Sequence, residues 1–316
     1  MGSVQATKCL SFLGMGIMGA AMAANLSRKL AVGNLGAASL KVWNRSAGRP
    51  GLALAAEAGA QVELDLNRCL AGSDVVFSCL GDEKDVHEVL TTQVAPLLAP
   101  SAIVVDFSTI GPSAAKQIEA ELAKRQVRFL DAPVTGGDIG ARQGTLTIMV
   151  GGMRQAFDEV LPYLETMGKT VVFCGPPGSG QALKLANQTL CALNLIGVCE
   201  ALYMAETLGL APSMVAEVLE NGAGGSWALS NLGRRITAND LKPGFAIKHM
   251  LKDLRLVFEN LPADRLPGTR LSLELFDRAL EALAQQAEGP EGMELGTQAM
   301  IKAYSAAPER NSGCHW

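Results

Sequence analysis

In the first half of the chain, short apolar runs alternate with stretches in which apolar residues recur at helical spacing. The runs occupy residues 9–13, 40–43, 75–79, 103–106 and 127–130, and such runs are typical of strands buried on both faces of a sheet. Alanine-rich helical patterns lie between them, at residues 18–30, 51–58, 84–90 and 113–124. Because strands and helices alternate, this half predicts a doubly wound parallel sheet.

The pattern changes after residue 174. A cluster of glycine and proline at residues 175–180 precedes a helical run from 181 to 208, which would be about 40 Å long at ~1.5 Å per residue. Helical patterns follow at 212–221, 226–232, 246–260, 271–286 and 294–305. We therefore expect an α/β domain over residues 1–175 and an all-α domain over 176–316, joined by one long helix.

Composition supports a folded protein with a large core. Of the 316 residues, 48% are hydrophobic and 18% are charged, against a typical charged share of about 25%. The formal net charge is −4, so no basic excess exists to neutralise phosphates, and a nucleic acid is not an expected partner.

The cysteines and histidines do not form metal-ligand patterns. The seven cysteines include no C-x-x-C pair and the three histidines are scattered, which favours a reducing compartment and predicts a cytoplasmic protein without a metal. Residues 9–27 carry no charge and resemble a short membrane span or a signal segment. Their glycines and the lack of a basic leader favour a soluble protein that does not bind membranes.

The glycines of this uncharged run form a G-x-G-x-x-G motif directly after the first strand, with Gly14, Gly16 and Gly19. In a dinucleotide-binding turn the first glycine permits the bend, the second lets backbone amides approach a pyrophosphate, and the third allows close helix packing. The alternative is a turn in which the glycines are only structural. Because the motif lies in the first βα unit of an α/β pattern, we favour dinucleotide binding in a Rossmann domain.

The residues after the second strand bear on which dinucleotide binds. An acidic residue at this position binds the ribose hydroxyl of NAD, whereas an arginine accommodates the 2′-phosphate of NADP. Here Asn44, Arg45 and Ser46 follow the strand, and no carboxylate occurs before Glu57. Arg45 can therefore bind a phosphate, which predicts NADP(H), unless it is simply a solvated surface arginine.

Two further segments carry candidate chemistry. Residues 131–137 place Thr135 before Gly136 and Gly137, and exposed amides of such a loop can bind a small anion such as a carboxylate. Lys184 lies three residues before Asn187 in the long apolar helix, so both fall on one face, where a desolvated lysine can act as an acid. A purely structural glycine turn and a lysine that extends to solvent are the alternatives.

Three ordered signatures resemble those of the β-hydroxyacid dehydrogenases, the family of 3-hydroxyisobutyrate dehydrogenase, tartronate semialdehyde reductase and glyoxylate/succinic semialdehyde reductase. They are the cofactor turn at 12–26, the loop at 131–146, and residues 178–187 with Lys184 and Asn187. Residues 252–254, after Phe245, are also similar. The resemblance spans residues 8 to about 305, although the segment 27–39 is longer than usual and Glu294 stands where the family has Asp.

The resemblance implies roles for individual residues. Lys184 would protonate the substrate oxygen, Asn187 would orient the substrate, and Thr135, Gly136 and Gly137 would hold its carboxylate. Phe245 and Asp253 would close over the substrate. The implied cofactor contacts are Gly14, Met15, Gly16, Ile17, Met18, Gly19, Asn44, Arg45, Ser46, Leu80, Thr109 and Lys252.

The resulting hypothesis is an NADPH-dependent reductase of small aldehyde-acids such as glyoxylate or succinic semialdehyde, assembled as a homodimer or homotetramer. An NAD-dependent 3-hydroxyisobutyrate-type dehydrogenase and a cofactor-binding module without catalysis are the alternatives. A 6-phosphogluconate-type enzyme would have a histidine where Ala186 stands, and an imine reductase would lack Lys184. The sequence leaves the physiological substrate open.

Overall fold

The computed structural model describes residues 8–33, 35, 37–285 and 292–305, which form two compact units, Met1–Ala186 and Asn187–Trp316. In the described part of the first unit, nine strands form one sheet in the order β3-β2-β1-β4-β5-β6-β8-β7, with β9 paired to β8. The strands are β1 (Lys8–Leu13), β2 (Ala37–Trp43), β3 (Gln61–Val62), β4 (Val75–Ser78), β5 (Ile103–Asp106), β6 (Arg128–Asp131), β7 (Val134–Thr135), β8 (Leu146–Gly152) and β9 (Gly168–Gly175).

The first six strands have the order of a Rossmann fold, and they are parallel to one another. The sheet then changes direction, because β8 pairs antiparallel with β6 and β7 while β9 runs parallel to β8. The chain order reverses between β1 and β4, and ligands of such sheets bind at the carboxyl ends of the strands at this point.

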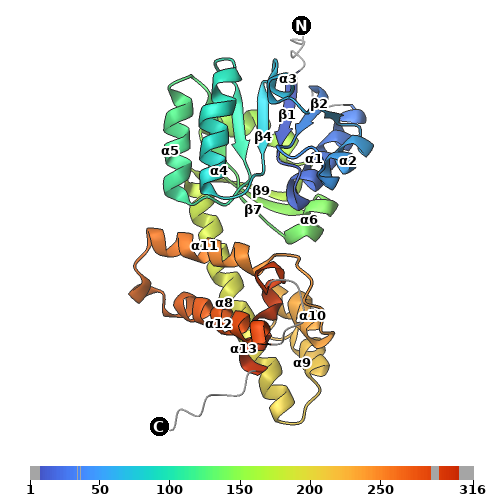
Figure 1. Ribbon diagram of the computed structural model, residues 1–316, viewed down its shortest axis with the longest axis vertical. Helices are drawn as coiled ribbons and strands as arrows, with labels where there is room; N and C mark the ends of the chain where they lie inside the picture. Colours follow the sequence, from blue (N-terminus) through green and yellow to red (C-terminus); the bar gives the residue numbers. More distant parts are fainter. Residues whose placement is uncertain (1–7, 34, 36, 286–291, 306–316) are drawn as a thin grey trace. The chain divides into compact units, whose positions relative to one another are not determined.

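Two apolar layers cover the sheet, because side chains alternate between its faces along each strand. Leu10 and Phe12 of β1 pack in a cluster with residues of α1 (Ile17–Ala31), α2 (Pro50–Glu57), α6 (Gly137–Gln143) and α7 (Arg154–Leu164). Leu13 packs on the opposite face with α3 (Leu66–Leu70), α4 (Glu83–Glu88) and α5 (Pro112–Ala123). Figure 1 shows α4 and α5 on one side of β1 and β4, with α1 and α2 on the other.

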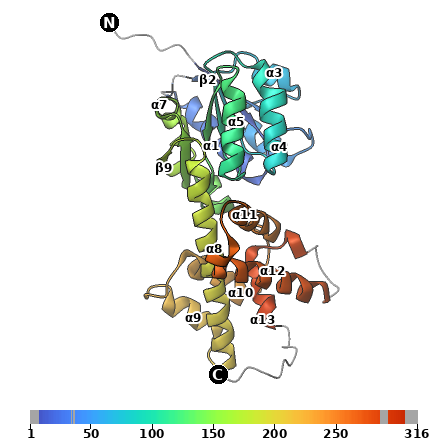
Figure 2. The same ribbon diagram turned by 90° about the vertical axis from the view of Figure 1, so that its left-hand side faces the viewer.

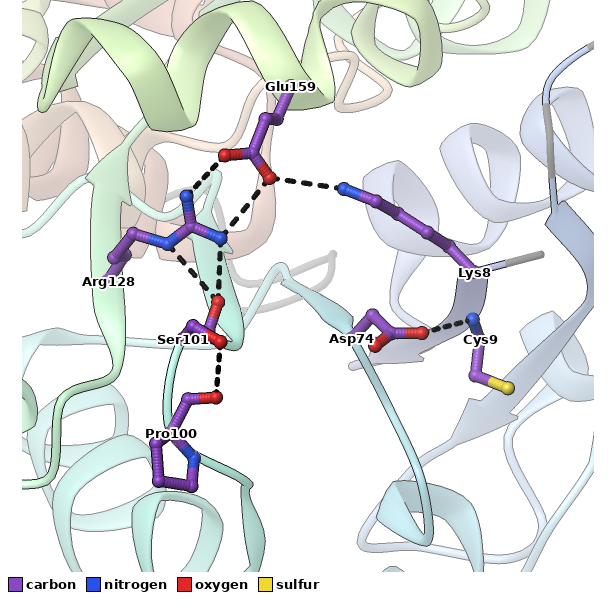
Figure 3. A network of polar contacts seen from close by, with 7 residues as sticks. All are labelled: Lys8, Cys9, Asp74, Pro100, Ser101, Arg128 and Glu159. Carbon is purple, nitrogen blue, oxygen red and sulfur yellow. Dashed lines mark hydrogen bonds and ion pairs between the residues drawn. The ribbon is translucent and has the colours of Figure 1, made fainter. Parts of the chain in front are cut away.

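A polar network joins the amino ends of the strands, at the edge opposite the expected site (Figure 3). Glu159 of α7 accepts hydrogen bonds from Arg128 at the start of β6 and lies 3.2 Å from the Lys8 Nζ of β1. The Arg128 guanidinium also donates to the Ser101 carbonyl, just before β5. This network secures the ends of three strands and leaves the carboxyl edge of the sheet to other contacts.

The second unit is helical. The long helix α8 (Ser179–Thr207) begins in the first unit, and its later turns pack in a core with α11 (Ile247–Asn260), α12 (Pro267–Gln285) and the segment Thr297–Ile301 (Figure 2). A smaller cluster joins α8 to α9 (Pro212–Leu219) and residues 228–229. The remaining described α-helices are α10 (Arg234–Thr237) and α13 (Lys302–Ser305), and a π-helix occupies Ala228–Gly233.

The predicted fold class is confirmed, with corrections to its parts. All five predicted strands are present, but the sheet is not wholly parallel, and the pattern did not reveal β3, β7, β8, β9, α3, α6 or α7. The predicted boundary at residue 175 differs from the division after Ala186, which lies inside α8. The predicted helix at 294–305 is instead two short 3₁₀ turns and α13, and residues 286 and 306–316 lie outside the described part.

Within the described residues, α8 is long and apolar enough to cross a membrane by length and composition. Its apolar residues Ala192, Leu195, Cys199 and Leu202 are nevertheless buried in the two clusters of the second unit. A core helix of a globular domain has the same length and composition, so α8 is best described as the central helix of this unit.

Candidate active site

The glycine-rich turn lies between β1 and α1, at the carboxyl end of β1. Gly14 has a φ of +93°, and a Cβ there would lie 2.2 Å from the Cys79 carbonyl oxygen after β4, so no larger residue fits. A Cβ on Gly19 would lie 2.0 Å from the Gly14 oxygen, whereas one on Gly16 would meet nothing within 4 Å. Gly16 precedes α1, and no side chain caps this helix start. The free approach to these amides fits a pyrophosphate.

The segment after β2 is held against this turn. The Asn44 Oδ1 accepts a hydrogen bond of 2.9 Å from the Met15 amide, and its Nδ2 donates to the Ser46 carbonyl. Arg45 is exposed, and its guanidinium lies 3.4 Å from the Asp85 carboxylate of α4. Asn44 thus holds the backbone next to Arg45 against the glycine-rich turn. The side chain of Arg45 remains exposed.

The loops after β4 and β5 are joined by hydroxyl and carboxyl groups. Asp106, at the end of β5, accepts hydrogen bonds from the hydroxyls of Ser78 (2.7 Å) and Ser108 (2.8 Å). The Ser108 hydroxyl in turn accepts a hydrogen bond from the Leu80 amide. Leu80 and the half-buried Thr109, both expected cofactor contacts, therefore lie on two loops that are connected at this edge.

The expected substrate loop follows Asp131, the last residue of β6. Thr135 belongs to β7 and pairs with Thr147 of β8, which places the two following glycines at the end of a short ladder. Gly136 and Gly137 have φ values of +125° and +65°, and a Cβ on Gly137 would meet no atom within 4 Å. The Gly137 backbone is therefore open to approach, as the binding of a carboxylate by this loop would require.

Lys184 and Asn187 lie on α8, three residues apart, and therefore on one face of the helix. The Lys184 side chain is only 6% exposed. A lysine is rarely fully buried unless its charge is paired, and the burial of Lys184 argues against the alternative of a lysine that extends to solvent.

In the second unit, polar residues of α8 and α11 contact one another. Asn187 donates to the Gln188 Oε1 (2.9 Å), and the Gln188 Nε2 donates to the Asp253 Oδ2 (2.7 Å). Asp253 is 1% exposed and its Oδ1 lies 3.1 Å from the Lys252 Nζ. The structure thus brings together three of the predicted residues through Gln188, which sequence reasoning missed. The Phe245 ring lies beside the His249 ring, with 5.9 Å between the ring centroids and the planes tilted by 36°.

Two buried carboxyl groups lie at the carboxyl edge of the sheet. Asp106 and Asp131 are register partners on adjacent strands, and both are fully buried. Burial raises the pKa of each carboxyl from the ordinary 3.8 to about 6, although hydrogen bonds to both oppose the shift. The pKa of each carboxyl is therefore higher in the folded protein than in the unfolded chain.

This difference predicts that stability falls as pH rises. Near pH 4 the buried carboxyls of the folded protein are protonated, and their contribution to the free energy of unfolding is present. As pH rises through about 6 this contribution is lost, which lowers the free energy of unfolding by about 1–3 kcal/mol. Asp106→Asn removes one titrating group. The melting temperature of this variant minus that of the unaltered protein, measured at the same pH, should therefore increase from about pH 5 to about pH 8. A relative melting temperature that is constant over this range would contradict the assignment.

These features are those of a dinucleotide-dependent oxidoreductase: a Rossmann unit with a glycine-rich turn at its switch point, and a helix that carries a buried lysine. Among the described residues, no three His, Cys, Asp or Glu side chains gather where they could hold a metal ion.

Family comparisons identify the group within this class. Residues 9–175 match the NAD-binding domain of 6-phosphogluconate dehydrogenase, and residues 178–304 match the NAD-binding domain of NADP-dependent 3-hydroxyisobutyrate dehydrogenase. The chain therefore belongs to the β-hydroxyacid dehydrogenase family.

Individual relatives support this membership. The chain is 43% identical to an uncharacterized oxidoreductase of Synechocystis, over 94% of this chain and 98% of that protein. It is 36% identical to 2-hydroxy-3-oxopropionate reductase of Escherichia coli, over 85% and 90% of the two chains. The crystal structure of 3-hydroxyisobutyrate dehydrogenase from Salmonella typhimurium superposes with a TM-score of 0.78 at 27% identity, covering 93% and 99%. The chain is thus similar to hydroxyacid dehydrogenases over nearly its whole length.

Proposed function

We propose that this protein reduces small aldehyde-acids to hydroxy acids with NADPH, and that Lys184 is the general acid. The observation that carries the proposal is the burial of Lys184, at 6% exposure, one helical turn before Asn187 on α8. Family membership establishes oxidoreductase chemistry on hydroxy acids with a nicotinamide dinucleotide. The buried lysine supplies the proton donor that such chemistry needs.

The proposed roles follow from the charge that develops during reduction. When bound, the reduced cofactor supplies a hydride to the aldehyde carbon. Negative charge then develops on the substrate oxygen, where the Lys184 ammonium would stabilise it and donate a proton. Asn187 would orient the substrate, and the amides of Thr135, Gly136 and Gly137 would hold its carboxylate. In this arrangement carboxylate-free aldehydes are poor substrates.

The preference for NADPH rests on Arg45. This arginine follows β2 where NAD-binding members of the fold carry a carboxylate, and Asn44 secures its backbone to the pyrophosphate turn. The match of residues 178–304 to an NADP-dependent 3-hydroxyisobutyrate dehydrogenase supports the same cofactor. Leu80 and Thr109 of the first unit, with Lys252 of the second, complete the proposed cofactor contacts.

A substrate panel tests the proposed function. Steady-state rates would be measured with glyoxylate, succinic semialdehyde and 2-hydroxy-3-oxopropionate, each with NADPH and with NADH, and with 3-hydroxyisobutyrate in the oxidative direction. Propionaldehyde, which lacks the carboxylate, is the matched control. We expect the highest kcat/KM for an aldehyde-acid with NADPH. Turnover confined to NAD and 3-hydroxyisobutyrate would instead establish the dehydrogenase alternative, and no turnover with any pair would leave only cofactor binding.

We also propose that the protein assembles as a homodimer or homotetramer and works in the cytoplasm. Large apolar side chains of α8 remain exposed along most of its length, and burying such a surface in a subunit interface is favourable. They are Leu183, Leu190, Leu193, Tyr203 and Met204. Light scattering at micromolar concentration should give at least twice the 33.1 kDa of one chain. A mass of one chain under these conditions would refute the assembly.

A further inference from the structure

Gln181, in the first turn of α8, makes three buried hydrogen bonds that have no role in the proposed chemistry. This side chain is fully buried. Its Oε1 accepts hydrogen bonds from the amides of Ile110 (3.0 Å) and Gly111 (3.1 Å), and its Nε2 donates to the Ser108 carbonyl (2.9 Å). Two of these groups are donors and one is an acceptor. A single carboxamide can pair with all three, because its oxygen accepts and its nitrogen donates.

The three bonded groups surround Thr109, the residue expected beside the nicotinamide. Ser108 precedes it and Ile110 follows it, so Gln181 holds the backbone on both sides of this position. The Ser108 hydroxyl extends the same network to Asp106 and to the Leu80 amide. Gln181 therefore acts on the loop that carries Thr109 and, through Ser108, on the loop that carries Leu80.

A second set of contacts holds the start of the helix itself. The Asp131 carboxylate accepts hydrogen bonds from the amides of Gly178 (2.7 Å) and Gln181 (2.9 Å), which are the otherwise unpaired donors of a helix start. A Cβ on Gly180 would lie 2.2 Å from the Met149 oxygen, so α8 begins in direct contact with β8. Lys184 lies one turn beyond Gln181, on the same side of this anchored helix.

We propose that Gln181 is a positioning residue that fixes the Thr109 loop relative to the helix turn bearing Lys184. The inference rests on the proposed function, because it assumes that Lys184 donates the proton and that the Thr109 loop contacts the nicotinamide. A hydride donor and a proton donor must both be aligned with one carbonyl, and misplacement by about 1 Å can lower a rate by about 10²-fold. A single side chain that bonds both elements meets this requirement.

The test compares Gln181→Met with a matched control, Glu159→Met. Both substitutions remove three side-chain contacts from the same unit, the first at the carboxyl edge and the second at the amino edge shown in Figure 3. The measurement is the single-turnover rate constant for NADPH oxidation by the aldehyde-acid with the highest kcat/KM for the unaltered enzyme. Loss of folded protein lowers the amplitude of this reaction but not its rate constant, which separates positioning from stability.

We expect Gln181→Met to lower the rate constant by about 10- to 100-fold and Glu159→Met to leave it within about twofold. A Gln181→Met rate constant within about twofold of the unaltered value would overturn the proposal. If the unaltered enzyme oxidises NADPH with no compound of the panel, the proposed function fails first, and the two failures are thereby distinguished.

Gln181→Glu provides a second test that does not depend on the folding of the methionine variant. When the introduced carboxyl group is ionised, it can still accept from Ile110 and Gly111 but cannot donate to the Ser108 carbonyl, whereas the protonated group can. Burial and the nearby carboxylates of Asp106 and Asp131 raise the pKa of such a group, while Lys184 on α8 and Lys116 on α5 oppose this. The single-turnover rate constant of Gln181→Glu, relative to the unaltered enzyme, should therefore rise as pH falls from about 8 to about 5. A ratio near one at every pH would overturn the proposal.

Discussion

Lys184→Ala should lower kcat by about 10²–10⁴, the usual effect of removing an acid–base group from a reaction that transfers a proton. Without the ammonium, negative charge on the substrate oxygen has neither an adjacent cation nor a proton donor. The dissociation constant of NADPH should change little, because the glycine turn and Arg45 lie on other elements. Steady-state kinetics and nicotinamide fluorescence on binding would measure the two quantities.

Two further variants make this result specific. Lys184→Arg keeps the positive charge, but a guanidinium does not give up a proton at neutral pH, so kcat should lie between those of the alanine variant and the unaltered enzyme. Lys124→Ala removes an exposed lysine whose ion pair with Glu121 lies at the end of α5, and it should leave kcat unchanged. Near-normal turnover by Lys184→Ala would show that the buried lysine serves only packing.

The parts of the fold that could be predicted are those that the local sequence dictates. The first strands are continuous apolar runs because both of their faces are covered, and such runs are recognisable without knowledge of their partners. The roles of Gly14 and Gly19 as the bend and the close-packing residue agree with the contacts that a Cβ would make there. A turn is built from neighbours in the chain, so its requirements remain visible in the sequence.

The strands that were not predicted depend on contacts with residues far away in the sequence. The strand β9 contains an apolar run of only four residues, 171–174, directly before the cluster of glycine and proline, and its residues after Gly168 are exposed or half-buried. The strand β8 ends in two glycines, which ordinarily weaken a strand. In the fold they are required, because a Cβ on Gly151 would lie 2.6 Å from the Asp131 Oδ1 and 2.8 Å from the Gly180 amide. A Cβ on Gly152 would lie 2.5 Å from the Leu130 Cδ2, so the neighbouring strand β6 and the start of α8 together explain these two glycines.

The candidate site also has a part that could be predicted from neighbouring residues and a part that depends on distant contacts. Lys184 and Asn187 are three residues apart on one helix, so their common face could be predicted. The partners of Gln181 lie 70 to 73 residues away, and the bond between Gln188 and Asp253 spans 65 residues. Glutamine has no characteristic spacing in a sequence, and its importance here comes from groups that the fold brings to it.

Arg45→Asp should reduce the preference for NADPH over NADH by about 10- to 100-fold, since a charge-assisted hydrogen bond to the 2′-phosphate contributes about 1.5–3 kcal/mol. The measurement is the ratio of kcat/KM values for the two cofactors. Arg270→Asp, which replaces an exposed arginine of α12, is the control and should leave this ratio unchanged. Equal use of both cofactors by the unaltered enzyme would contradict the assignment.

A substitution at Asp85 should have the opposite effect and strengthen the binding of NADPH. Its carboxylate lies 3.4 Å from the Arg45 guanidinium, with the two side chains 42% and 74% exposed. An exposed pair of this kind is worth at most about 1 kcal/mol, so Arg45 can leave it to bind a phosphate at small cost. Asp85→Asn removes the competing anion and should increase NADPH affinity by up to about fivefold, with NADH affinity unchanged. If Asp85→Asn instead weakened NADPH binding, the carboxylate would be holding Arg45 in its binding position, and the ion pair would belong to the cofactor site itself.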